Sequence, residues 1–230
     1  MSKDINKENF DFIPELLPIE KSHYQQIIDV KETIIKIFIN RGFINSENKI
    51  KYTKKLIENE NDDMEYILYL DNDKNYNTEI LNKKIYIKIF DYKISSLNKT
   101  SPIGEYISKY DKEYKFIIVQ DINPKIEDTI IDKYLTQVEI FKFNELQSDI
   151  TEHDFVPPHI VLTKEEGNNV LESYRARKRD MPLMKSNEAV AKYYNIKSGD
   201  VVKIIRPSQI TGESIAYRLV YKSKDLKVKT

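Results

Sequence analysis

The first apolar pattern in the chain has the period of a helix. Between positions 23 and 40 isoleucine and phenylalanine recur every three or four residues, which predicts one amphipathic helix. Ser22 and Gln25 have the spacing of a capping box, in which each side chain binds a backbone amide at the helix start. Gly42 follows the last apolar turn and can adopt the left-handed conformation that stops a helix. Both ends of this helix are therefore predicted from local signals.

A weaker helical pattern follows, and then strand signals begin. Two strand-like runs, 65–70 and 84–90, flank the turn-rich stretch 71–74. Ser101 and Pro102 then mark another helix start, because serine is a preferred N-cap and proline is tolerated at the first helical position. We therefore expect strands and helices to alternate in this part of the chain.

The next segment has the length and pattern of a crossover unit. A strand over 115–120, a helix over 124–134 capped by Asn123 and a strand over 137–141 follow one another closely. A strand, a helix and a strand in that order form a right-handed connection between parallel strands. The first part of the chain is thus predicted to be an α/β layered domain with a mixed sheet.

The last third has its own start and stop signals. Thr163 and Glu166 form a second capping box, and Ser186 is expected to cap a further helix. Two strands, 201–206 and 214–221, are predicted to close the chain as a β-hairpin with a long loop. This part is predicted to be a small α+β domain.

The terminal hairpin has apolar positions on both faces. The faces alternate along each strand, with Val202, Ile204 and Val220 on one and Lys203, Ile205 and Tyr217 on the other. Arg206 and Arg218 are expected near the loop end. Two apolar faces suit a sheet that is covered on both sides.

Charge divides the chain at the same place as the patterns do. The 230 residues carry 37 basic and 37 acidic side chains, but residues 1–149 carry 22 and 27 of them, whereas 150–230 carry 15 and 10. Three of the five glycines also fall in the last third. We therefore place a boundary near 147–151, giving domains 1–148 and 149–230 in a chain that is α+β overall.

Composition excludes several functional classes. The chain has no cysteine, which removes disulfide scaffolds, zinc ribbons and thiol catalysis. The first residues alternate in charge and lack the apolar stretch of a signal peptide, so we expect an intracellular protein. The most apolar run, 34–39, is interrupted by a lysine and is far too short to cross a bilayer. We expect a soluble protein that does not contact a membrane.

Candidate catalytic and metal sites are weak. His153 and His159 lie six residues apart beside carboxylates, but two prolines between them prevent a helical face, so a packed loop is favoured over a metal site. No two glycines are close enough for a phosphate loop. The tripeptide at 113–115, Glu-Tyr-Lys, leaves open a magnesium-dependent nuclease, with a solvated strand end as the simpler interpretation. No catalytic residue, metal or cofactor is predicted.

A basic cluster at 174–179 is more informative. It contains four cations within six residues, more than are needed to offset the dipole at a helix end. It could contact phosphate, act as a nuclear import signal or dock on an acidic protein surface. The sequence leaves these three roles open.

A longer run of motifs carries a resemblance to a known family. The residues that carry it are 149–163, 174–175, 181–182, 191–194, 199–208 and 217–220. They resemble the assembly domain of the fifth-largest subunit of eukaryotic RNA polymerases, and the archaeal counterpart of that subunit is similar to this part alone. More weakly, 41–43, 116–120 and 141–146 resemble the jaw domain of the eukaryotic subunit. The chain departs from the family at Pro158, 187–188, 195–196 and 210–212, which concerns details of the subunit contact.

The resemblance implies a non-catalytic subunit of a DNA-directed RNA polymerase. It implies docking on the largest subunit, among other polymerase subunits, through His153, Val156, Pro157, Pro158, His159, Tyr174, Arg175, Arg206 and Arg218. It also implies a jaw beside downstream double-stranded DNA, with a weak and non-specific contact at Asn123, Pro124 and Lys125.

Location follows from the same resemblance, and two other functions stay open. A eukaryotic subunit implies the nucleus, and a version from a large DNA virus implies the cytoplasmic replication factory and the virion. The nuclease is the enzyme alternative. A free-standing DNA-binding regulator is the other, although the net charge of −5 in residues 1–149 argues against tight independent binding.

Overall fold

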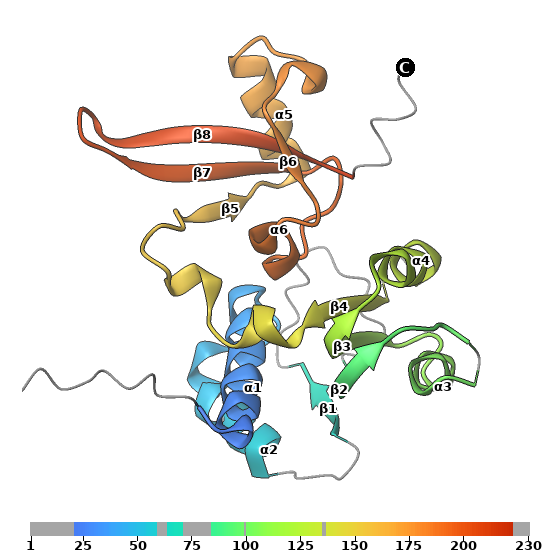
Figure 1. Ribbon diagram of the computed structural model, residues 1–230. Coiled ribbons are helices and arrows are strands. Elements are labelled where there is room, and N and C mark those ends of the chain that lie inside the picture. Colours follow the sequence, from blue (N-terminus) through green and yellow to red (C-terminus); the bar gives the residue numbers. More distant parts are fainter. Residues whose placement is uncertain (1–20, 59–63, 71–83, 99, 135–136, 223–230) are drawn as a thin grey trace, which may run out of the picture.

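Two four-stranded sheets organise the chain in the computed structural model (Figure 1). The structure describes residues 21–58, 64–70, 84–98, 100–134 and 137–222. The strand order is β1-β2-β3-β4 in the first sheet and β5-β7-β8-β6 in the second. The predicted α+β class is confirmed. The predicted turn at 71–74 lies outside the described residues.

The first sheet is mixed, as predicted. It is built from β1 (Glu65–Tyr69), β2 (Lys84–Ile94), β3 (Tyr114–Ile122) and β4 (Val138–Lys142). β1 runs antiparallel to β2, whereas β2, β3 and β4 are parallel. The crossover from β3 to β4 passes through α4 (Pro124–Tyr134), which confirms the predicted unit.

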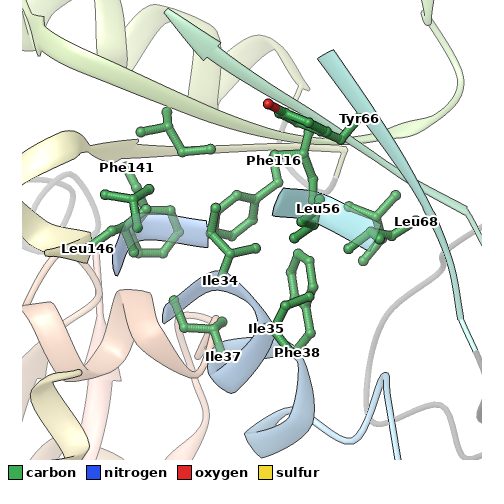
Figure 2. Close-up of a cluster of buried hydrophobic side chains, with 14 of the residues drawn as sticks. Ile34, Ile35, Ile37, Phe38, Leu56, Tyr66, Leu68, Phe116, Phe141 and Leu146 are labelled. Atoms are coloured by element: carbon green, nitrogen blue, oxygen red, sulfur yellow. The ribbon is translucent and has the colours of Figure 1, made fainter. Parts of the chain in front are cut away.

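Helices cover both faces of this sheet. α1 (His23–Asn40) and α2 (Lys49–Glu58) pack on one face, and α3 (Pro102–Lys109) and α4 on the other (Figure 1). β3 is one of the two inner strands, and alternate residues of it enter opposite cores: Phe116 packs with α1 and α2, while Ile117 packs with α3 and α4. Figure 2 shows the first of these cores, with Phe116 and Phe141 facing Ile34 and Phe38 of α1. A strand buried on both faces has a continuous apolar run in its sequence, as β3 has.

The two ends of α1 follow their local signals, with one correction. Ser22 accepts a hydrogen bond from the backbone N–H of Gln25 at 3.3 Å, and Gly42 has a φ of +74°. The side chain of Gln25, however, donates to Asp29 at 3.2 Å. The predicted capping box is therefore only half formed, because an acidic side chain one turn later attracts the glutamine amide.

The second sheet is smaller and is partly made of strands that the sequence did not predict. Its strands are β5 (His159–Val161), β6 (Leu183–Lys185), β7 (Val201–Ser208) and β8 (Gly212–Tyr221). α5 (Lys164–Ser173), with its predicted capping box complete, lies on one side of the hairpin, and α6 (Ala189–Tyr193) lies on the side toward the first sheet (Figure 1). The three-residue strands β5 and β6 are too short to leave a periodic signal.

Two local predictions in this part are wrong. Ser186 does not cap a helix, because its backbone N–H donates to the carbonyl of Tyr221 at 2.9 Å and continues the pairing of β6 with β8. Glu188 holds the N-cap position instead. The hairpin loop is short, because the pairing extends to Ser208 opposite Gly212 and leaves only 209–211 as the turn.

A buried arginine joins the two sheets. Arg41, at the end of α1, donates to both carboxylate oxygens of Glu139 on β4, at 2.9 and 2.8 Å. Its guanidinium also donates to the backbone carbonyls of Tyr193 at 2.7 Å and Lys192 at 2.9 Å. The ring of Tyr193 packs in the first core. The predicted boundary between residues 148 and 149 thus lies between β4 and β5, in a chain whose two parts are in contact.

Within the described residues, no helix has the length and apolar character needed to span a bilayer.

Candidate functional site

The loop with two prolines is held against the hairpin. The carbonyl of Pro158 accepts a hydrogen bond from the N–H of Ile205 at 3.0 Å, and the carbonyl of Pro157 lies 2.6 Å from Nδ1 of His159. Val156 donates from its N–H to the carbonyl of His153 at 2.8 Å. Val156 and Pro157 are half-buried, and Pro158 is exposed. The loop therefore presents a fixed backbone at the surface.

An aromatic side chain beside this loop was missed by sequence reasoning. Phe155 is 88% exposed, and its ring centroid lies 5.7 Å from that of His153, which is also exposed. Large exposed aromatic side chains are typical anchors of protein interfaces. The available signal was a phenylalanine next to Asp154 within the family motif.

Three of the predicted residues converge on one face of the second sheet. These residues are His159, Arg206 and Arg218. His159 lies opposite Ile204, and Arg218 lies opposite Val202, and directly opposed residues share a face of the sheet. Arg206 follows Ile204 by two residues, so all three side chains lie on the face that carries the small core. Burial, and then the nearby charges of Arg218 and Arg206, lower the pKa of His159 below its ordinary value. These contacts favour the neutral form of the ring.

The expected place of one arginine is corrected here. Arg206 lies opposite Ser214, close to the turn, but Arg218 lies opposite Val202, away from it. The error follows from the predicted long loop. Within the described part of the chain, neither guanidinium forms an ion pair.

The other two predicted contact residues lie on the opposite face. Tyr174 directly follows α5, and its ring contacts that of Tyr217 at a centroid distance of 5.9 Å. Arg175 has a φ of +49° and is exposed. The predicted set is thus divided between two faces of one sheet. The face with Tyr217 is only partly covered, so the expectation of two covered faces is wrong for its outer end, where Ile215 is 52% exposed.

Part of the basic cluster after α5 is neutralised locally. Asp180 accepts from Arg177 at 2.9 Å and lies 3.8 Å from Arg179. The hydrogen bonds from Arg177 hold the pKa of Asp180 below its usual value. Asp180 therefore offsets part of the positive charge that residues 174–179 place on this surface.

The predicted DNA-proximal turn is a capped and exposed helix start. Oδ1 of Asn123 accepts a hydrogen bond from the N–H of Lys125 at 3.1 Å, and Pro124 is the first residue of α4. All three residues are exposed, and Lys125 forms no ion pair with any described residue. Glu127, the nearest carboxylate in the helix, lies 3.6 Å from Lys192.

More cations stand at the same edge of the first sheet. Asp121, at the end of β3, accepts from Lys93 at 2.9 Å and from Lys142 at 3.0 Å. These two lysines lower the pKa of Asp121 to about 2. Glu127 and Glu145 act on Lys142 as well, so this edge of the sheet carries charges of both signs.

The nuclease tripeptide is inside the protein. The side chain of Lys115 is completely buried and donates to the carbonyl of Glu113 at 2.8 Å. Burial lowers the pKa of Lys115. A solvated strand end was therefore the wrong expectation, and nothing supports the nuclease. Among the described residues no group of three histidine or acidic side chains could hold a metal ion.

Comparisons with known proteins agree with the family motif. The family model "RNA polymerase Rpb5, C-terminal domain" matches residues 148–220. The chain is 32% identical over 215 residues to "DNA-directed RNA polymerases I, II, and III subunit rpabc1" of Dictyostelium discoideum, a match that covers 90% of this chain and 98% of the relative. It is 28% identical to "DNA-directed RNA polymerase subunit 5" of Acanthamoeba polyphaga mimivirus, over 89% of this chain and 97% of the relative. "DNA-directed RNA polymerase subunit Rpo5" of Thermofilum pendens is 44% identical over 72 residues, which are 31% of this chain and 90% of the relative.

Proposed function

The chain belongs to the RPABC1/Rpb5 family of DNA-directed RNA polymerase subunits, and from this premise we propose that its second sheet docks on the largest subunit while its first sheet lies beside downstream DNA. The chain is a non-catalytic component of the polymerase complex, associates with other polymerase subunits and serves transcription. One observation carries this conclusion: the similarity covers 98% of the Dictyostelium relative, and so includes both sheets.

The surface around the proline loop supports docking of the second sheet. Pro157 and Pro158 restrict the backbone, which lowers the entropy lost when a partner binds. Phe155 offers an apolar anchor, and Arg206 and Arg218 offer two guanidinium groups without carboxylate partners among the described residues. A partner surface with an apolar pocket and nearby acidic groups complements this arrangement.

The start of α4 supports a phosphate contact. The first-turn N–H groups and the helix dipole favour an anion, and the exposed ammonium group of Lys125 lies beside them. Lys93 and Lys142 place two further ammonium groups at the same edge, and Asp121 pairs with both of them. Such a contact is weak and independent of DNA sequence.

Affinity purification tests the assembly proposal. The tagged full chain is expressed in cells whose own copy is depleted, and the co-purified proteins are identified by mass spectrometry. We expect the largest polymerase subunit in stoichiometric amount. A tagged 149–230 fragment tests the domain boundary, and we expect it to be incorporated as well. Recovery of a folded chain without the largest subunit would contradict the proposal.

For location we propose the nucleus, because the eukaryotic relatives are named as subunits of RNA polymerases I, II and III. The similarity to the mimivirus subunit supports a viral version, which would act in a cytoplasmic replication factory. Fluorescence imaging of the tagged chain in its own host distinguishes the two.

A further inference from the structure

The hairpin of the second sheet extends beyond its neighbouring strands. β5 pairs with β7 only at 202–204, and β6 pairs with β8 only at 219–221. The pairing of β7 with β8 continues to Ser208 and Gly212 at the turn. The outer half of the hairpin, which projects past the rest of the sheet in Figure 1, is therefore a two-stranded ribbon with two edges.

The direction of the backbone groups along both edges follows from three hydrogen bonds. The N–H of Val220 donates to the backbone carbonyl of Asp200, which lies inward, on the side of β7. The N–H of Leu219 donates to the backbone carbonyl of Pro182, which lies outward, on the side of β6. On β7, the N–H of Ile205 donates outward to Pro158. Because directions alternate along an antiparallel strand, odd-numbered residues of both strands point their N–H and C=O groups away from the ribbon.

The two edges of the ribbon differ. On β7 the next outward position is Pro207, which has no N–H to offer. On β8 the outward positions are Glu213, Ile215 and Tyr217, and within the described residues their N–H groups have no hydrogen-bond partner. Proteins commonly protect free edges with proline or charge. One edge here is closed by proline, and the other is open.

Beside the open edge one face carries Ile215 between Glu213 and Tyr217, and the other face carries two arginines. Ile215 is 52% exposed, and Ile210 at the turn is 95% exposed. The opposite face carries Arg206 and Arg218, with no ion pair to any described residue. A strand added to this edge would meet an isoleucine on one side and an arginine on the other.

We propose that an extended segment of the largest polymerase subunit adds as a fifth strand to the free edge of β8, with apolar residues facing the side of Ile215 and an acidic residue facing Arg218. Main-chain hydrogen bonds to 213, 215 and 217 supply affinity, and the alternating side chains supply specificity. The inference rests on the proposed function, because it deepens the docking on that subunit.

A proline substitution in the full chain tests whether an outward N–H of β8 is needed for assembly. Ile215→Pro removes one outward N–H and is tolerated in an edge strand that faces solvent. Ile215→Val is the matched control, since it keeps the N–H and a β-branched apolar side chain. We expect Ile215→Pro to lower retention in the affinity-purified polymerase about tenfold, and Ile215→Val to retain it. Equal retention of both variants overturns strand addition.

Hydrogen exchange gives a readout that does not depend on a variant. In the free chain we expect the inward amides of Ser214 and Ala216 to be protected, and the outward amides of Ile215 and Tyr217 to exchange fast. We expect assembly with the polymerase to slow exchange of the outward amides at least about tenfold, and to leave the inward ones nearly unchanged. Absence of new protection at 215 and 217 overturns the proposal, even if Ile215→Pro fails to fold.

The outcomes distinguish this inference from the function on which it rests. If the wild-type chain does not co-purify with the largest subunit, the proposed function itself fails. If the wild-type chain co-purifies, but Ile215→Pro is retained as well as the wild type and the amides of 215 and 217 gain no protection, only the strand addition fails. Concentration-dependent dimers of the free wild-type chain that Ile215→Pro abolishes would assign the edge to a second copy, which also overturns it.

Discussion

The two sheets differ in how much of their surface the chain itself covers. Among the described residues, the first sheet has two buried clusters of 21 and 11 residues, one on each face, whereas the second has a single cluster of six. The exposed large apolar side chains of the second sheet and its loops include Phe155, Ile160, Ile210 and Ile215. The first sheet is therefore stabilised mainly from within the chain, and the second retains surface for a partner.

The family model falls on the less buried of the two sheets. Residues 148–220 contain the smaller core, yet they are the ones that match it. Many of the motif residues in this range, such as His153, Arg175 and Arg206, are exposed. Packing alone does not require those residue types at exposed positions, which agrees with a docking role for the second sheet.

The largest expected effect is on the small core. Ile204→Asp puts a carboxylate among the five other buried residues of the small core, and we expect it to cost more than about 4 kcal/mol and unfold the second sheet. Ile210→Asp, at a 95% exposed position, should leave the melting temperature unchanged. Thermal unfolding followed by circular dichroism measures both.

A second substitution on the same face tests the contrast between core and docking surface. Arg218 is half-buried and has no ion pair with described residues, so Arg218→Glu should leave the sheet folded and weaken incorporation into polymerase. If circular dichroism shows Arg218→Glu unfolded to the same extent as Ile204→Asp, Arg218 has a structural role.

A smaller loss is expected at the contact between the sheets. Arg41→Met leaves the carboxylate of Glu139, whose side chain is 11% exposed, without its bidentate partner, and we expect a loss of about 3–5 kcal/mol in urea unfolding. The double variant with Glu139→Leu should recover most of that loss, because the carboxylate that lost its bidentate partner is then removed as well. Failure of the second substitution to recover stability would show that the bonds from Arg41 to the carbonyls of Lys192 and Tyr193 dominate.

Sequence reasoning succeeded where a structure is determined by local residues. The structure confirms the Ser22 cap of α1 and the Asn123 cap of α4, which depend on neighbours within a few positions. It also confirms the crossover from β3 to β4, in which strand, helix and strand follow one another directly along the chain. The apolar run at 115–120 correctly predicted the strand β3.

The errors arise where a distant strand decides the conformation. Ser186 has the sequence of a helix cap, but Tyr221, 35 positions later, takes its N–H into a sheet. β5 and β6 exist only because β7 and β8 offer edges to them. The incomplete capping box of α1 has a different, local cause, because the side-chain amide of Gln25 donates to Asp29 one turn later.

The candidate site was only partly predictable for the same reason. The family resemblance indicated Arg218, but only the register places it opposite Val202 and beside His159. The exposure of Phe155 and the open edge of β8 depend on which strands end early, a property that spacing in the sequence does not record.

A smaller effect than that of Arg41→Met is expected from the loop with two prolines, through its rigidity. Changing both Pro157 and Pro158 to glycine should lower folding stability by about 1–2 kcal/mol, through the entropy of the unfolded chain. The carbonyl of residue 158 can still accept from Ile205, so the loop stays attached to β7. We expect incorporation into polymerase to fall by more than this change in melting temperature explains. Proportional losses in both measurements would make the loop purely structural.

The smallest effect is expected on the first sheet, at its proposed DNA contact. Lys125→Glu replaces one exposed cation at the start of α4, and a single phosphate contact accounts for a change of about 0.9 in the slope of log affinity against log salt. Assembly and catalysis should therefore be unchanged, while elongation complexes dissociate at lower salt on every template. Lys133→Glu, near the other end of the same helix, is the matched control, because it makes the same change of charge away from the helix N-terminus. Equal salt sensitivity of the wild-type and Lys125→Glu polymerases would remove Lys125 from the DNA path, and of the two proposed contacts only the docking by the second sheet would then remain.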